Sequence, residues 1–108
     1  MNTQENSMAI YMTAQWKCHP GAEARVEAAL RQFVATIKEK EPGTRVYTAL
    51  QEVEDVTSFM TYFIFEDETA RDVHRSTEWV KKFTDVIYPQ NEEQVTFTQY
   101  QLIASTED

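Results

Sequence analysis

The chain of 108 residues is poor in cysteine and glycine. Its single cysteine, Cys18, cannot form a disulfide within the chain, which favours a reducing compartment, and we expect a cytoplasmic protein. Gly21 and Gly43 are the only glycines, so a glycine-rich loop that cradles a dinucleotide or a phosphate is excluded. The Cys-x-x-Cys, His-Glu-x-x-His and Gly-x-Ser-x-Gly motifs are absent as well, which removes the commonest redox, zinc and hydrolase signatures.

Long apolar runs and positive charge are also scarce. No run approaches the ~18 apolar residues that a bilayer-spanning helix needs, and residues 1–7 do not resemble a secretory signal. Lys and Arg number 10 against 18 Asp and Glu, a formal net charge of -8. Such a chain repels phosphate backbones and anionic lipids. We therefore expect no nucleic-acid and no membrane partner, although a pocket with its own local field can still bind a small anion.

What is present is an ordinary globular balance, with 42% hydrophobic and 26% charged residues. A chain of this length buries about two-thirds of its unfolded surface, which is enough for one core. We expect one domain over residues 8–104, with loose ends at residues 1–7 and 105–108.

Alternating apolar and polar side chains predict four β-strands. In the first of them Ile10, Met12 and Trp16 share one face, whereas Tyr11 and Thr13 share the other. The predicted strands cover residues 9–17, 45–53, 58–66 and 94–104.

Helical spacing of apolar residues predicts a long helix between the first two strands, which starts near Ala22 and is ended by Pro42. Asp67 is expected to cap a second helix that runs to about Arg75. Ser76 or Thr77 caps a third, which runs through residue 87. The order is βαββαβ with the second helical segment broken in two. It predicts an α+β, ferredoxin-like fold with all helices on one face of a four-stranded antiparallel sheet.

The third predicted strand is apolar on both faces, although helices cover only one. Phe59, Phe63 and Phe65 point one way, and Met60, Tyr62 and Ile64 point the other way. A monomer would leave one apolar face in water, which implies a partner. An isologous homodimer through the two bare sheet faces is the simplest arrangement; scattered surface aromatics without a partner are the alternative.

Several stretches resemble the antibiotic biosynthesis monooxygenase family. His19-Pro20-Gly21 is similar to the Pro-Gly turn that precedes the first helix of the family, and Glu41-Pro42-Gly43 with Tyr47 is similar to its next helix-to-strand turn. Residues 65–74 resemble its aromatic-x-Asp-x-x-Ala-x-x-x-His stretch. The spacing of the whole set over residues 9–90 is the specific part.

This resemblance implies a dimeric α/β barrel with a ligand cavity between the sheet and the helices of each subunit. It also implies an enzyme that oxidises electron-rich phenols, quinols or anthrones with O2 and without flavin, haem or metal. Such substrates become reducing once deprotonated, so the site has to bind a ring, take up a proton and admit oxygen. The expected function is a cofactor-independent monooxygenase of a small aromatic or quinol-type compound.

His74 is the candidate catalytic residue, because the resemblance places it in that cavity and histidine titrates near neutrality. Its alternative role is purely structural, as a packed side chain at a helix end. The candidate substrate-binding residues are aromatic, although core packing is an alternative for each: Trp16, Tyr47, Phe63, Trp79 and Phe83.

One position departs from the family pattern. Many relatives carry a glutamate where this chain has Phe63, so we expect His74 to lack a polar partner and the pocket to be more apolar. His74 stands where the haem-degrading branch has a tryptophan, and we predict no haem. No metal site is predicted either, because His74 and Glu78 alone are too few ligands.

Two other functions stay open on the same scaffold. One is a non-catalytic dimer that binds an apolar small molecule or assists a neighbouring enzyme, which Phe63 favours. The other is an isomerase or a cyclase.

Overall fold

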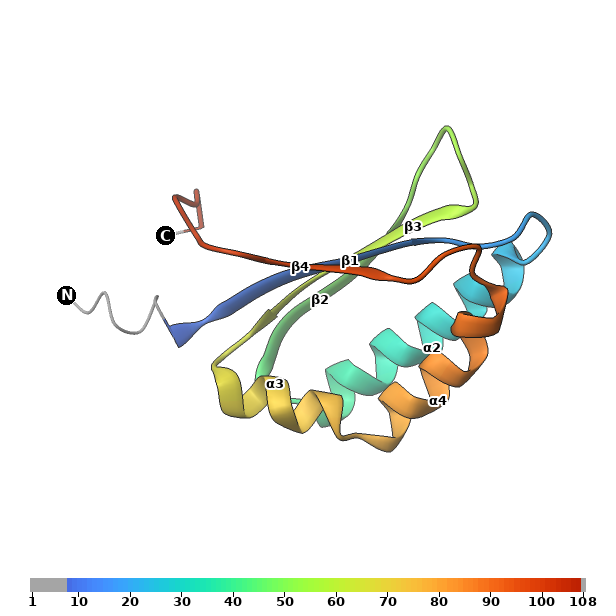
Figure 1. The fold of residues 1–108 in the computed structure, drawn as a ribbon. Helices are drawn as coiled ribbons and strands as arrows, with labels where there is room; N and C mark the ends of the chain where they lie inside the picture. The colour runs from blue at the N-terminus through green and yellow to red at the C-terminus, as the bar shows by residue number, and fades with distance from the viewer. Residues whose placement is uncertain (1–7, 108) are drawn as a thin grey trace.

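The computed structural model describes residues 8–107. Its elements, in chain order, are β1 (Ile10–Lys17), α2 (Glu23–Lys40), β2 (Thr44–Gln51), β3 (Ser58–Phe65), α3 (Glu68–Arg75), α4 (Glu78–Ile87), the 3-10 turn η1 (Tyr88–Gln90) and β4 (Thr96–Tyr100) (Figure 1). The predicted loose N-terminus at residues 1–7 lies outside the described residues, as does Asp108 of the predicted tail.

The four strands form one antiparallel sheet in the order β2-β3-β1-β4. Figure 1 shows α2, α3 and α4 together on one side of this sheet. The predicted α+β, ferredoxin-like fold is therefore confirmed. The last strand is shorter than predicted: it pairs with β1 only from Thr96 to Tyr100, because β1 itself begins at Ile10 and offers little ladder beyond Tyr11.

The core lies between the inner face of the sheet and the helices. The long helix α2 buries Val26, Leu30, Phe33 and Ile37, which recur at the three- and four-residue spacing of one helical face. Burial of such side chains stabilises the fold by about 1.5–3 kcal/mol each. None of the helices in residues 8–107 has the length and apolar character that crossing a bilayer requires.

Side-chain caps start both α3 and α4. The Asp67 carboxylate accepts a hydrogen bond from the backbone N–H of Ala70 at 2.9 Å and starts α3. The Thr77 hydroxyl oxygen accepts from the N–H of Val80 at 3.2 Å and starts α4, and the same hydroxyl donates to the carbonyl of His74 at 3.0 Å. The two Thr77 bonds fix the last turn of α3, which carries His74.

Gly43 allows the start of β2 to approach α3 closely. A Cβ atom built at Gly43 would lie 2.7 Å from the Cβ of Ala70, closer than two carbon atoms can pack. The Glu41-Pro42-Gly43 turn therefore brings the end of α2 against α3.

The outer face of the sheet is not covered by any element of residues 8–107 (Figure 1). Register places Tyr62 of β3 and Tyr100 of β4 on this face, with exposed fractions of 37% and 48%. Leu50 of β2 lies on the same face and is 52% exposed. The sequence-based expectation that β3 has two apolar faces is confirmed.

Candidate functional site

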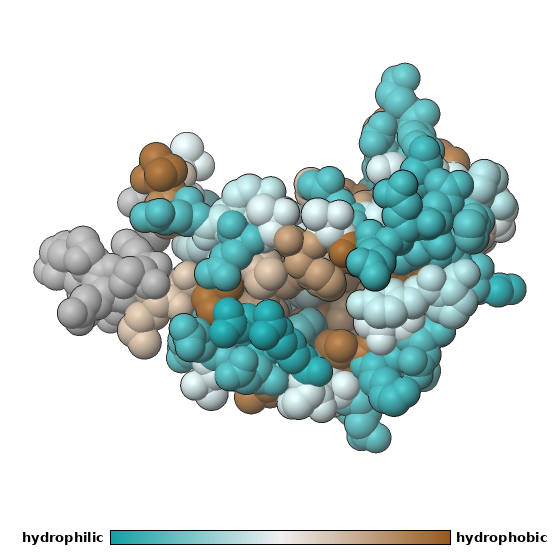
Figure 2. Space-filling model, viewed as in Figure 1, coloured by the Kyte–Doolittle hydropathy of each residue, from teal (hydrophilic) through white to brown (hydrophobic). Residues whose placement is uncertain are grey.

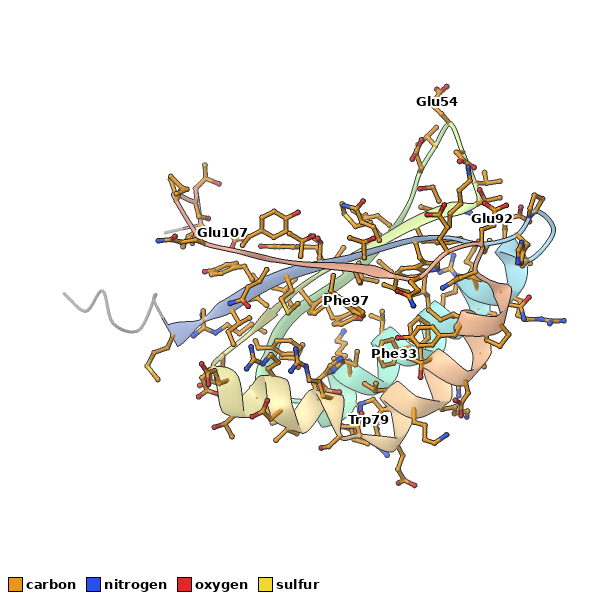
Figure 3. The ribbon with its side chains drawn as sticks, in the orientation of Figure 1. Phe33, Glu54, Trp79, Glu92, Phe97 and Glu107 are labelled. Atoms are coloured by element: carbon orange, nitrogen blue, oxygen red, sulfur yellow. The ribbon has the colours of Figure 1, made fainter. Side chains whose placement is uncertain are left out.

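A cavity of about 340 Å³ lies between the inner face of the sheet and helices α2, α3 and α4. Figure 2 shows the corresponding hollow, rimmed by tan and brown apolar atoms. Phe97 of β4 and Tyr88 of η1 line the cavity and are 57% and 50% exposed, so the cavity opens beside them. In Figure 3, Phe97 and Phe33 point from opposite layers into this space. The volume suits one small aromatic ligand.

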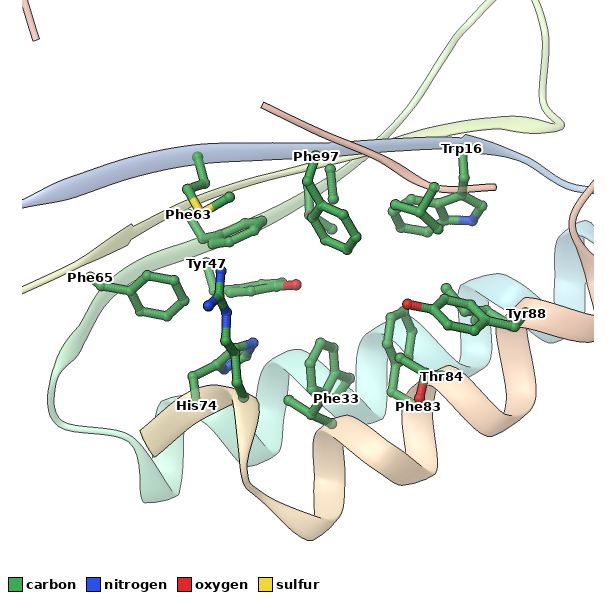
Figure 4. A pocket seen from close by; sticks show the side chains of 17 residues that line it. Trp16, Phe33, Tyr47, Phe63, Phe65, His74, Phe83, Thr84, Tyr88 and Phe97 are labelled. Carbon is green, nitrogen blue, oxygen red and sulfur yellow. The ribbon is translucent and has the colours of Figure 1, made fainter. Parts of the chain in front are cut away.

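His74 is a polar group in the wall of this cavity. It lies in the last turn of α3, is 8% exposed, and its ring points from the helix into the cavity (Figure 4). Four aromatic rings surround it, with centroids 5.1 to 6.4 Å from its own, and they belong to Phe33, Tyr47, Phe63 and Phe65.

The carboxylate of Glu41 is hydrogen-bonded to the imidazole of His74. Glu41 follows the last turn of α2 and is 5% exposed. Its Oε1 atom lies 2.8 Å from Nδ1 of His74 and accepts a second hydrogen bond from the Thr44 hydroxyl at 2.7 Å. Its Oε2 atom accepts a hydrogen bond from the indole N–H of Trp79. Three side chains from three segments therefore converge on one buried carboxylate.

The charge state of Glu41 follows from these contacts. Burial raises the pKa of the Glu41 carboxyl, but the hydrogen bonds from His74, Thr44 and Trp79 outweigh burial and hold the pKa below its ordinary value of 4.5. Glu41 is therefore ionised at neutral pH, and an ionised carboxylate only accepts hydrogen bonds. The proton of a neutral His74 ring then sits on Nδ1, which leaves the Nε2 lone pair free to accept a proton.

Tyr47, Thr61 and Trp16 contribute neutral polar groups to the cavity. Burial raises the pKa of the Tyr47 phenol well above its usual range, so its hydroxyl stays protonated. The Thr61 hydroxyl is buried near the Tyr47 phenol but, like the buried Trp16 indole N–H, makes no hydrogen bond of normal geometry among residues 8–107. Both residues line the cavity, where a ligand can supply the missing partners.

Most of the site residues predicted from the sequence come together here. The structure places five of the six in the cavity wall: Trp16, Tyr47, Phe63, His74 and Phe83. Trp79 is the exception, because it lines a separate groove between α2 and α4 and reaches the site only through its hydrogen bond to Glu41. The stick view shows Trp79 among the helices, on the side away from the sheet (Figure 3).

The expectation that His74 lacks a polar partner is wrong. The Phe63 ring lies near the His74 ring, with centroids 6.4 Å apart, but Glu41 supplies a carboxylate at 2.8 Å from Nδ1 of His74. Sequence reasoning treated Glu41 only as part of a turn. A usable signal was present, since a carboxylate next to a helix C-terminus is disfavoured by the helix dipole and needs donors nearby.

A family model matches most of the chain. The model of the antibiotic biosynthesis monooxygenases matches residues 9–86, which hold β1 through most of α4. The chain belongs to this family. The match includes all the side chains of the Glu41–His74–Trp79 cluster and most of the cavity wall. No curated protein matches the chain.

Solved structures share the monooxygenase-family fold. A Bacteroides thetaiotaomicron protein that carries the same family name is similar at 18% identity, with a TM-score of 0.86 over 94% of this chain and 95% of its own. A Caulobacter crescentus protein of that name has 19% identity and a TM-score of 0.83 over 95% and 100% of the two chains. A Pseudomonas aeruginosa protein has 24% identity and a TM-score of 0.80 over 90% and 96%. At these identities the similarity establishes the fold.

Proposed function

We propose that the chain is a cofactor-independent monooxygenase that oxidises a small aromatic or quinol-type compound with O2, and that His74 is its catalytic base. The observation that supports this most strongly is the pairing of His74 with a buried, ionised Glu41 at the wall of an aromatic cavity. Trp16, Tyr47, Phe63 and Phe83 would bind the substrate ring.

In this reaction the protein accepts a proton from the substrate and encloses the substrate in the cavity. Nε2 of His74 takes a proton from an acidic C–H or phenol O–H of the ring compound, which leaves an electron-rich carbanion or phenolate. The Glu41 carboxylate stabilises the imidazolium that forms, as the carboxylate of a catalytic triad does. The aromatic walls exclude water and strengthen these electrostatic interactions.

Oxygen and substrate supply the rest of the chemistry. For an activated CH2 group, the carbanion passes one electron to O2, and the resulting radical and superoxide combine to form a C–O bond. The peroxide takes back the proton held by His74. Loss of water then breaks the O–O bond and the second C–H bond, so that CH2 and O2 become a carbonyl group and H2O. The substrate itself is the reductant, and no other electron donor is required.

Oxygen uptake with a panel of quinols and anthrones tests this proposal. We expect uptake by the parent protein and a loss of about 100-fold or more in His74→Ala, the usual contribution of a general base. His19→Ala is a matched control, because His19 is the other histidine and is exposed in the turn after β1. Uptake that is absent from the parent, or equal in both variants, would contradict catalysis by His74.

A second candidate is a non-catalytic protein that binds an apolar small molecule. The buried Phe63 in the wall favours it, because it makes the cavity less polar where relatives have a carboxylate. Ligand binding without oxygen uptake would support this function. Turnover in the absence of oxygen would instead identify an isomerase or a cyclase.

The proposal includes a homodimer in the cytoplasm. The uncovered outer face of the sheet presents Leu50, Tyr62 and Tyr100, and packing two copies of this face together removes the apolar surface of both from water. The single cysteine, Cys18, is buried and unpaired, which is compatible with a reducing compartment.

A further inference from the structure

Arg75 gives the cavity lining a positive charge in a protein whose net charge is -8. The 17 lining residues include this arginine and no aspartate or glutamate, in a chain with 18 acidic residues. Arg75 is an exposed residue, so its guanidinium lies at the solvent-facing edge of the cavity, and it is charged at every physiological pH. The cavity lining therefore carries one positive group at Arg75, while the ionised Glu41 lies behind His74 and does not line the cavity.

Arg75 has no acidic partner within the described part of the chain. Four of the nine other Lys and Arg side chains form ion pairs within 4.0 Å: Lys17 with Asp55, Arg31 with Glu27, Arg71 with Asp72 and Lys81 with Asp85. No carboxylate of residues 8–107 lies within that distance of the Arg75 guanidinium. Its position in the last turn of α3 is favourable for the helix dipole, but that interaction leaves the guanidinium free to bind.

Unpaired polar atoms inside the cavity also indicate a polar ligand. Thr61 is fully buried, lines the cavity and has no hydrogen-bond partner for its hydroxyl among residues 8–107. Trp16 is 6% exposed, and its indole N–H also has no hydrogen-bond partner among these residues. Buried polar groups that are left without a partner destabilise the unliganded protein. A ligand that carries oxygen atoms can satisfy them, whereas a pure hydrocarbon cannot.

We propose that the ligand of this cavity is an aromatic acid. Its ring packs among the aromatic side chains, its ring oxygen substituents face Thr61 and Trp16, and its carboxylate binds the Arg75 guanidinium at the end of α3. This inference rests on the proposed function only in taking the cavity as the substrate site, and it narrows the substrate class to anionic ring compounds.

Binding of two matched probes tests the inference without turnover. At neutral pH 2-naphthoic acid is an anion and 2-naphthalenemethanol is neutral, while their rings are the same. Isothermal titration of the parent protein should show the anion bound at least about tenfold more tightly, as expected for a charge-assisted hydrogen bond. Arg75→Gln should abolish this preference and leave the affinity for the alcohol unchanged, and Arg75→Lys should retain part of it.

Arg25→Gln is the matched control, because it removes the same charge from an exposed position of α2 that does not line the cavity. It should keep the preference of the parent. The inference would be overturned if Arg75→Gln kept the parent's preference for the anion over the alcohol. It would also be overturned if the parent showed no preference or bound neither probe. Oxygen uptake is measured separately: an Arg75-dependent preference without any uptake would contradict the monooxygenase proposal and support the anionic ligand.

Discussion

Glu41 and His74 are 33 residues apart in the chain and share a buried hydrogen bond of 2.8 Å between Oε1 and Nδ1. The carboxylate follows the end of α2, where the helix dipole is unfavourable for negative charge. Donors from β2, α3 and α4 compensate for that position. One residue thus connects the packing of three elements to the orientation of the candidate catalytic base.

Glu41→Gln should lower the rate of oxygen uptake by at least about tenfold, because a neutral amide does not stabilise the imidazolium form of His74. The pH profile of the rate should shift with it, which a purely structural role of Glu41 would not cause. Glu39→Gln is the control, since this residue of α2 is exposed. A variant with a normal rate and a normal pH profile would rule out a positioning role for Glu41.

The stability that Glu41 contributes should depend on pH. Because the pKa of the folded state lies below the ordinary value of 4.5, the unfolded state binds more protons as the pH falls through that range. The contribution is therefore complete above pH 4.5 and decreases as the pH falls through the depressed pKa. Urea unfolding of the parent and of Glu41→Gln measures the difference, which should shrink below pH 4.5; a difference that stays constant down to pH 3 would refute this.

Gly43→Ala should destabilise the fold by about 1–3 kcal/mol, because the new Cβ would meet that of Ala70 at 2.7 Å. Ala70→Gly should relieve part of this cost in the double variant, a coupling that a double-mutant cycle in urea detects. Gly21→Ala is the comparison: it is strained by a φ of 97° but has no atom within 4 Å, so Ala70→Gly should not rescue it. If the stability effects of Gly43→Ala and Ala70→Gly simply add in the double variant, the structure accommodates the new Cβ without strain against Ala70.

Thr61→Val should stabilise the unliganded protein by about 1 kcal/mol, because it replaces a buried, unpaired hydroxyl by a methyl group of similar size. Thermal unfolding measures the change. Thr57→Val is a matched control, since the Thr57 hydroxyl is also buried but donates to Asp55 at 2.6 Å, and its loss should destabilise. A loss of stability at Thr61 would mean that its hydroxyl is satisfied in solution.

Tyr62→Glu should dissociate the proposed homodimer, because two like charges would face each other on an uncovered, apolar sheet face. Sedimentation at micromolar concentration should give about twice 12.6 kDa for the parent and 12.6 kDa for the variant. Val73→Glu places the same charge on an exposed position of α3, on the helical side, and should leave the dimer intact. A monomeric parent would end the dimer proposal.

Much of the fold was predictable because its signals are local. The 26-30-33-37 spacing of α2, the Asp67 and Thr77 caps and the alternation of β3 involve residues only a few positions apart. The end of β4 was not predictable in this way, since a strand ends where its neighbour stops offering hydrogen bonds, and that neighbour is β1 at the other end of the chain.

The site also has a part that the sequence predicts and a part that it does not. The aromatic residues of the cavity wall follow from strand and helix periodicity together with the family resemblance. The partner of His74 does not, because the position of Glu41 at a helix end indicates a need for donors but not which side chains, 33 residues away, supply them. Trp79 is aromatic like the residues of the cavity wall, yet it lines the groove between α2 and α4 and donates a hydrogen bond to Glu41.

The amino-acid sequence by itself determined the elements, their order and the apolar faces of the sheet, since these depend on interactions between near neighbours and on burial of periodic apolar side chains. Only the tertiary structure decided which polar groups meet. A buried carboxylate, an imidazole and an unpaired guanidinium acquire their roles from side chains tens of residues away, and those contacts exist only once α2, α3 and α4 have packed on the sheet.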